Sequence, residues 1–394
     1  MVTWLLLGGL AAADTLTLSR ALQMAAAARP ILRAAGAAVA VARAEIGVAG
    51  AVPNPSVGYS HTQDTPSEHL TVQQPFDWLA RRGADRAAAR AGVTAAEADS
   101  VRTTAELNGE VRRAFYGAVA AAEAVRLIEA EARVADSLAV LSGRRLAEGD
   151  IAAMEHDRVR LEAARVGQLV LRAREAVGTT QLMLQRVIGS PAGGPDLIAS
   201  GDLGAGLDVS DRRPRIPASL VLPVVLMAQA DSAGAVFRVR GVRRGRLPVP
   251  GVEFGADWAD PAQPGRRLWL FGLSLPLPIW NRSGPLVAVA TARSTRATAL
   301  LAEARLDAAR QLATADLQVR SAAVRARAGR DSLVPAARRL RAQAVLAYQL
   351  GETGILPVLD ALRAEREIES AALEDLLAFQ EALASWYALV GSVE

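Results

Sequence analysis

The segment Pro53-Asn54-Pro55-Ser56-Val57-Gly58-Tyr59 returns about 200 residues later as Pro248-Val249-Pro250-Gly251-Val252-Glu253-Phe254. The prolines, one valine and an aromatic residue hold the same places in both copies. Further along the chain, Gly149-Asp150 matches Gly351-Glu352, and Ile188-Gly189 matches Val390-Gly391. Because the offset stays nearly constant, the chain is predicted to contain one structural unit twice.

The two copies set the expected domain boundaries. We expect a first repeat over 14–189 and a second over 218–394, joined by a linker over 190–217 that is rich in Gly, Pro and Asp. Each repeat has the same predicted order: an Ala-rich helical segment, two strands and a long helical region. In the first repeat, Pro30 divides the opening helical segment, because proline lacks the amide donor that a helix interior needs.

Both repeats change to a two-residue period at the Pro-x-Pro motif, which predicts β-hairpins over 53–78 and 248–280. Strands of about ten residues are expected, the length that crosses a bilayer when tilted. One face of the hairpins is apolar, and the other carries Glu253 and Asp257. The apolar face includes Val57, Tyr59, Val252, Phe254, Trp258, Trp269 and Phe271.

Aromatic residues are concentrated near these hairpins, although they make up only 4% of the chain. Eight of the aromatic side chains fall there: Tyr59, Phe76, Trp78, Phe254, Trp258, Trp269, Phe271 and Trp280. Membrane barrels place aromatic girdles at both lipid interfaces. A small soluble sandwich core is the alternative, but such a core would also use apolar residues of the helices.

Four strands are too few to close a membrane barrel, for which about eight is the lower limit. Open sheet edges are not tolerated in hydrocarbon, so the hairpins must be shared among subunits. We therefore predict a trimer with a barrel of about twelve strands. The apolar face would then contact lipid, and Glu253 and Asp257 would face the water-filled lumen.

The helical regions predicted over 82–189 and 285–394 are too long for an ordinary globular core. A stretch of about 60 residues forms a rod of about 90 Å. Part of the second region, from Leu333 through Ala337 and Leu340 to Ala347, steps by four and three residues, which predicts a heptad seam. The expected fold class is therefore mainly α, a long coiled-coil α-barrel to which each protomer adds four transmembrane strands.

Each long helix is predicted to end at a glycine, Gly149 or Gly351, because glycine suits a left-handed C-cap. A second helix then returns, so these turns form the tips farthest from the strands. Asp150 and Glu352 follow the glycines and could form an acidic ring that favours cations. Ordinary solvation of a helix turn explains the same two acids equally well.

Composition argues against several classes of function. All 45 basic residues are Arg, they alternate with acids, and the net charge is only +4, so a nucleic-acid partner is not expected. No Cys is present, which excludes disulfides, thiolate metal sites and a lipid-modified Cys. No phosphate-binding loop, nucleophile elbow or metal-ligand spacing occurs, so we expect neither an enzyme nor a cofactor. His61 and His69 flank the first hairpin turn and could contact an exported metal ion, although exposed loop residues of this type need no such role.

The first residues predict export. Trp4 to Ala13 is apolar and ends in small residues, so 1–13 is interpreted as a signal peptide, although Met1 to Thr3 carries no Lys or Arg. No later run approaches the roughly 18 apolar residues of a transmembrane helix.

Several short motifs occur in a fixed order along nearly the whole chain. They are Leu16-Thr17-Leu18-Ser19-Arg20-Ala21-Leu22, Arg29-Pro30, Pro53-Asn54-Pro55, Gln74-Pro75-Phe76 and Leu275-Pro276-Leu277-Pro278. With the duplicated glycine tips, they resemble the TolC-like outer-membrane efflux factor family, in the branch of heavy-metal and multidrug exporters. The resemblance implies a passive trimeric duct with a barrel in the outer membrane and an α-barrel in the periplasm. It also implies that the tips dock onto a periplasmic adaptor above an inner-membrane pump of the RND or ABC type.

Two other readings remain open at this point. A periplasmic adaptor would have one helical hairpin and many more strands, whereas here the entire unit is repeated. A coiled-coil scaffold would have no use for paired amphipathic hairpins. The residues do not identify the exported substrate.

Overall fold

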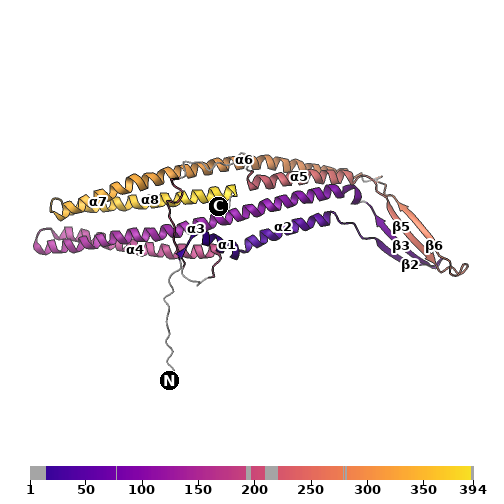
Figure 1. Ribbon diagram of the computed structural model, residues 1–394, viewed down its shortest axis with the longest axis horizontal. Helices are drawn as coiled ribbons and strands as arrows, with labels where there is room; N and C mark the ends of the chain where they lie inside the picture. Colours follow the sequence, from indigo (N-terminus) through magenta and orange to yellow (C-terminus); the bar gives the residue numbers. More distant parts are fainter. Residues whose placement is uncertain are drawn as a thin grey trace, which may run out of the picture. The chain divides into compact units, whose positions relative to one another are not determined.

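The computed structural model describes residues 15–76, 78–191, 197–208, 221–277, 279 and 282–391. The predicted signal peptide, Trp280 and much of the predicted linker lie outside these residues. Figure 1 shows a mainly helical chain with one group of long strands. The elements of the first half are β1 (Thr15–Leu16), α1 (Leu18–Ala28), α2 (Pro30–Ala49), β2 (Ser56–His61), β3 (Glu68–Pro75), α3 (Trp78–Glu148) and α4 (Ala153–Ile188). The later elements are β4 (Ile198–Ala199), α5 (Pro223–Arg244), β5 (Gly251–Trp258), β6 (Leu268–Ser274), α6 (Gly284–Ala328), the π-helical turn η1 (Gly329–Leu333), α7 (Val334–Gln349) and α8 (Ile355–Val390).

The described residues group into two compact units. The helical unit takes its residues from 1–32, 103–220 and 310–394, and the sheet unit from 33–102 and 221–309. Helices α3 and α6 contribute residues to both units.

The duplication predicted from the sequence is confirmed in the sheet unit. β2, β3, β5 and β6 form one antiparallel sheet in that order, so the two hairpins pair through β3 and β5. The strands contain 6 to 8 residues, shorter than the predicted ten. Proline explains two of the ends, because Pro55 precedes β2 and Pro75 closes β3, and proline cannot donate to a strand ladder.

The break predicted at Pro30 is also confirmed. The hydroxyl oxygen of Thr17 accepts the backbone N–H of Arg20 and so caps α1. Arg29 is extended, with ψ of 118°, and Pro30 is the first residue of α2, where its missing N–H costs nothing.

The second long helix is interrupted, which the sequence analysis missed. Helix α6 ends at Ala328, and the N–H of Val334 donates to the carbonyl oxygen of Gly329 across the π-turn η1. Pro335 follows, and its missing N–H leaves a gap in the α-helical ladder that the wider turn accommodates. Gly329 is needed for packing as well, because a Cβ at this position would lie 3.0 Å from the Cβ of Ala372.

The predicted heptad seam on this helix is partly exposed in the single chain. Ala337 is buried, but Leu333 and Leu340 are each about half exposed, at 52%. The π-turn ends at Leu333, so the rest of the seam, from Ala337 to Ala347, lies on the uninterrupted helix α7.

The segment after α4 is more than a linker. Its β4 strand pairs in parallel with β1, and Leu203 and Leu207 are buried in two apolar clusters of the helical unit. Gly201 is required by a close approach, since a Cβ there would lie 2.9 Å from the ring of Phe115. Among the described helices, none is both long and apolar enough to cross a membrane.

Candidate functional site

The sheet has one apolar face and one mainly polar face. Residues opposite one another in the ladder share a face, and the row Tyr59, Leu70, Ala256 and Trp269 shows how the apolar face extends across all four strands. The predicted residues Val57, Tyr59, Val252, Phe254, Trp258, Trp269 and Phe271 all lie on this face. Many of them are exposed in the single chain, with Phe271 at 78%.

Aromatic rings cluster at the centre of the apolar face. The ring of Phe254 lies 5.3 Å from that of Trp269 and 5.0 Å from that of Phe271, measured between centroids. These contacts join the two strands of the second hairpin and leave much of the aromatic surface uncovered.

The opposite face carries Glu253 and Asp257, as predicted. Two rows cross it: Ser56, Gln73 and Glu253 in one, and Ser60, His69 and Asp257 in the other. On β6 the same face ends in Leu268 and Leu270, so it is not uniformly polar. No Arg lies on this face within the four strands that the structure describes.

The two hairpin histidines each have a carboxylate partner. Nδ1 of His69 lies 2.9 Å from Oδ1 of Asp257, and its Nε2 lies 3.2 Å from the hydroxyl of Thr62. Nδ1 of His61 lies 2.9 Å from Oε1 of Glu68, and Oε2 of Glu68 accepts a hydrogen bond from the hydroxyl of Tyr59. Within the described residues, no group of three or more His, Asp or Glu could hold a metal ion.

Both predicted tips have the same backbone geometry. Gly149 and Gly351 have φ of 82° and 75°, in the left-handed region that the sequence analysis expected. The N–H of Asp150 donates to the carbonyl of Arg145, and that of Glu352 to the carbonyl of Ala347. This bond across five residues is the mark of a Schellman motif, so the turn chemistry is duplicated along with the sequence.

The two tips are in contact within the helical unit. The guanidinium of Arg145 lies 4.8 Å from the ring centroid of Tyr348, a fully buried side chain, and also approaches Gly351. Met154, Leu350 and Leu356 are more than half exposed near the turns. Each tip therefore combines acidic groups with uncovered apolar side chains.

Farther from the tips, ion pairs join α8 to α3 and α4. Arg363 donates to Glu162 at 2.7 Å, and Arg366 donates to Glu131 at 2.7 Å. Burial tends to raise the pKa of Glu162, but Arg363 and Arg366 outweigh it and hold that pKa below its usual value. Burial dominates at Glu131, whose pKa is raised although Arg366 opposes the shift.

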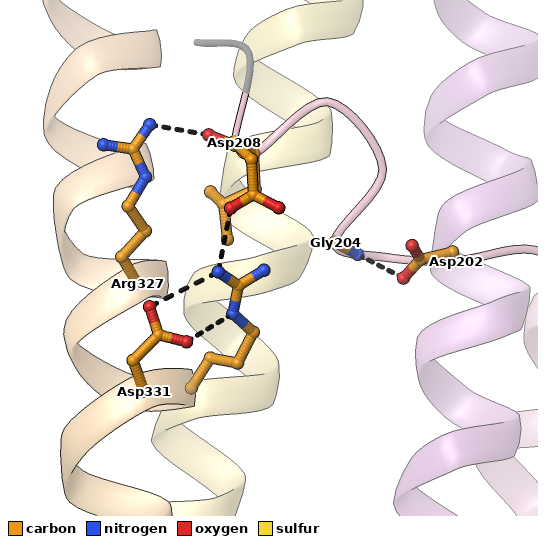
Figure 2. Close-up of polar contacts among 7 residues, drawn as sticks. Asp202, Gly204, Asp208, Arg327 and Asp331 are labelled. Carbon is orange, nitrogen blue, oxygen red and sulfur yellow. Dashed lines mark hydrogen bonds and ion pairs between the residues drawn. The ribbon is translucent and has the colours of Figure 1, made fainter. Parts of the chain in front are cut away.

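Figure 2 shows how the connector, the segment from Ser200 to Asp208 after β4, is held against the helical unit. Arg330 of η1 donates to Asp208 at 2.9 Å and to the neighbouring Asp331 at 2.7 Å, and Arg327 donates to the carbonyl of Leu207 at 2.6 Å. The amide of Gln380 on α8 donates to the carbonyls of Leu203 and Ala205. The connector is thus held against the helix at its π-turn.

The sequence analysis predicted the two sheet faces and the glycine tips. It did not predict the ion pairs or the hydrogen bonds that hold the connector. Glu162 and Arg363 lie in separate repeats, and no local pattern pairs them. The Gly, Pro and Asp content of this segment predicted a linker, so the burial of Leu207 was not expected, although its side chain is fully buried.

Comparison with known proteins shows similarity to outer-membrane efflux proteins in both sequence and fold. Residues 21–190 match the family described as outer membrane efflux protein. The chain is 24% identical over 365 residues to the cobalt-zinc-cadmium resistance protein CzcC of Cupriavidus metallidurans, covering 89% of this chain and 84% of CzcC. Its fold resembles the outer membrane protein VceC of Vibrio cholerae, with a TM-score of 0.77, 18% identity and coverage of 95% of this chain and 96% of VceC. It also resembles CusC, with a TM-score of 0.76, 18% identity and coverage of 95% and 92%.

The family match, the metal-resistance relative and the shared fold agree with the duplicated hairpins and helices described above. Residues 21–190 therefore carry an outer membrane efflux protein domain, and the chain as a whole has the fold of outer-membrane efflux channels.

Proposed function

We propose that three copies of this chain form one export duct that carries metal ions or other small molecules out of the cell. The observation that carries this proposal is the four-stranded sheet with an apolar face and two edge strands, β2 and β6. An open edge cannot stay unpaired in lipid, so β6 of one copy pairs with β2 of the next. Three copies give a closed barrel of about twelve strands.

The two faces then have different roles. Val57, Tyr59, Val252, Phe254, Trp258, Trp269 and Phe271 contact lipid. Glu253 and Asp257 line the lumen, where water relieves the cost of their charges. The repeats span 14–189 and 218–394, with the connector over 190–217 between them and a signal peptide over 1–13.

The tips at Gly149 and Gly351 are the proposed docking points for a periplasmic adaptor, and Asp150 and Glu352 border the opening there. An inner-membrane pump of the RND or ABC type would supply the energy, because the chain contains no recognisable energy-coupling site. The similarity to CzcC, a cobalt-zinc-cadmium resistance protein, favours metal cations over larger molecules as the exported substrate of this chain.

Conductance tests the duct directly. Purified trimers in a planar bilayer are expected to show discrete current steps that are small while the tips are closed. Asp150→Asn combined with Glu352→Gln should reduce the preference for cations if these acids border the opening. Folded trimers that pass no current would contradict the proposal.

Crosslinking tests the docking role of the tips. A cysteine at Asp150 or Glu352, next to the tip glycines but not on their left-handed backbone, carries little risk of background reaction, because the chain has no native Cys. Each is expected to be joined by a bifunctional reagent to a periplasmic adaptor that is co-expressed with this chain. Thr179, exposed on α4 and far from the tip, provides the control position. Equal reaction at Thr179 and at the tips would remove the support for tip docking.

A further inference from the structure

A groove lies on the apolar face of the sheet, at the end where the second hairpin turns. Its volume is about 580 Å³, within the usual range of ligand pockets. Apolar side chains from three strands form its floor: Leu70, Val72, Phe254, Ala256, Trp258 and Trp269. Arg266 and Arg267, from the turn between β5 and β6, also line it. The groove therefore combines an apolar floor with two cationic groups.

Hydrogen bonds within the sheet unit hold this turn in place. The N–H of Arg266 donates to the carbonyl of Gln263 at 3.2 Å, and the guanidinium of Arg266 donates to the Gln263 side chain. The hydroxyl of Ser67, in the first hairpin, donates to the carbonyl of Ala259 at 3.4 Å. Ala259 and Gly265 have φ of 66° and 79° and line the groove as well. The turn is thus folded against the apolar face before any ligand binds.

The charges of the two arginines are not balanced by nearby acids. Arg266 and Arg267 are both exposed, and within the part of the chain that the structure describes neither forms an ion pair. Among the four described strands, Glu68 is the one acid on this face, and its carboxylate already contacts the side chains of Tyr59 and His61. Two positive charges therefore remain for an anionic ligand.

The height of the arginines matches that of lipid headgroups. Leu268 pairs with Asp257 in the ladder, so Arg267, one residue earlier, lies level with Trp258. Trp258 follows Phe254, in the middle of β5, by four residues. At about 3.3 Å per residue this is about 13 Å along the strand, close to half of the roughly 25 Å apolar band of a membrane barrel. The guanidinium groups therefore lie where the hydrocarbon ends.

The groove belongs to the second repeat alone. The corresponding turn of the first hairpin, over 62–67, is shorter than the turn over 259–267 and contains no Arg. A general attraction of arginine to a lipid surface needs neither a groove nor a particular turn. Here one turn of each copy places two arginines beside an apolar groove, which indicates a defined ligand.

We propose that this groove binds a phosphate-bearing lipid of the membrane leaflet that the hairpin turns face. The phosphate contacts Arg266 and Arg267, whose guanidinium groups match phosphate oxygens with paired hydrogen bonds, and an acyl chain covers the apolar floor. A free phosphate ion would leave the floor uncovered, and a neutral lipid would leave both arginines unpaired. The site rests on the proposed outer-membrane duct and adds a specific lipid to its outer wall.

Lipid retention by the purified full-length protein tests this site. Trimers in a mild non-ionic detergent are incubated with lipid A, a phosphorylated and acylated disaccharide, and bound lipid is measured by native mass spectrometry. Arg266→Gln with Arg267→Gln is expected to lower the retained lipid about tenfold, because two charge-assisted contacts to phosphate are lost. Arg296→Gln with Arg305→Gln, at exposed arginines of α6, is the matched control and should retain as much lipid as the unchanged chain.

Two further ligands separate the lipid from its parts. An excess of inorganic phosphate should not displace lipid A, because the ion does not cover the apolar floor. Dephosphorylated lipid A should be retained by the unchanged chain as poorly as lipid A is by the double variant at Arg266 and Arg267. Displacement by inorganic phosphate, or equal retention of the dephosphorylated lipid, would overturn the proposal.

The mass and conductance of the same samples separate failure of this site from failure of the duct. Conducting trimers whose lipid retention does not depend on Arg266 and Arg267 would overturn the lipid site and leave the duct in place. A monomeric preparation that passes no current would overturn the duct, and the lipid site with it.

Discussion

Replacing Phe254 with arginine is expected to prevent the trimer from assembling in the outer membrane. Phe254 lies at the middle of β5 on the apolar face and packs against Trp269 and Phe271. An arginine facing lipid near the bilayer midplane costs about 2–4 kcal/mol, and a trimer would carry three of them. The measurement is the amount of heat-resistant trimer in outer-membrane fractions, which is expected to fall at least tenfold.

Glu253→Arg is the matched control for this change. It introduces the same side chain one residue earlier, on the face proposed to line the lumen. Its charge remains in water there, so trimer yield should stay close to that of the unchanged chain, whereas cation preference in bilayers should fall. If Glu253→Arg prevented assembly and Phe254→Arg did not, the assignment of the two faces would be reversed.

Glu162→Gln is expected to give the second large effect, a loss of about 2 kcal/mol of unfolding free energy. The Glu162 side chain is 4% exposed and neutralises Arg363 and Arg366, which come from the other repeat. Removing its charge leaves Arg366 with Glu131 as its carboxylate partner and leaves Arg363, which is 41% exposed, with Asp360 at 4.0 Å. Denaturation in detergent, followed by circular dichroism at neutral pH, measures the difference.

The pKa directions provide the control and a pH signature. The pKa of Glu162 is lowered in the folded chain, so its contribution is complete above the unfolded pKa and is lost as pH falls through the lower folded value. The pKa of Glu131 is raised, so ionising it opposes folding as pH rises. Glu131→Gln should therefore destabilise by about 1 kcal/mol or less. Equal losses for the two variants at neutral pH would contradict this assignment.

The sequence was sufficient for features set by local chemistry. Alternation along β5 predicted which side chains share a face, because side chains in a strand point alternately to opposite sides. Gly149 and Gly351 predicted their left-handed caps, because only glycine adopts that backbone conformation without strain. The helix break at Pro30 was predictable for the same reason, because proline lacks the backbone N–H donor that a helix interior needs.

Features that depend on distant partners were not predictable from the sequence. The π-turn at Gly329 reflects both Pro335 and the close approach of Ala372 on another helix. The predicted heptad seam begins at Leu333, where the π-turn ends, so its spacing gave no sign of the turn. Arg330 and Asp208 are separated by more than 120 residues, so their contact leaves no local pattern.

The pairing of β3 with β5 has a consequence for how the chain matures after synthesis. These strands are adjacent in the sheet, but roughly 175 residues of intervening chain must be accommodated before their ladder can close. Closing a flexible loop of that length costs about 5 kcal/mol, whereas helices that fold back at a glycine bring the ends together as they form. The first hairpin is therefore synthesised well before β5 and β6, with which it forms the sheet. Until those strands are available, the nascent chain needs a chaperone to prevent aggregation.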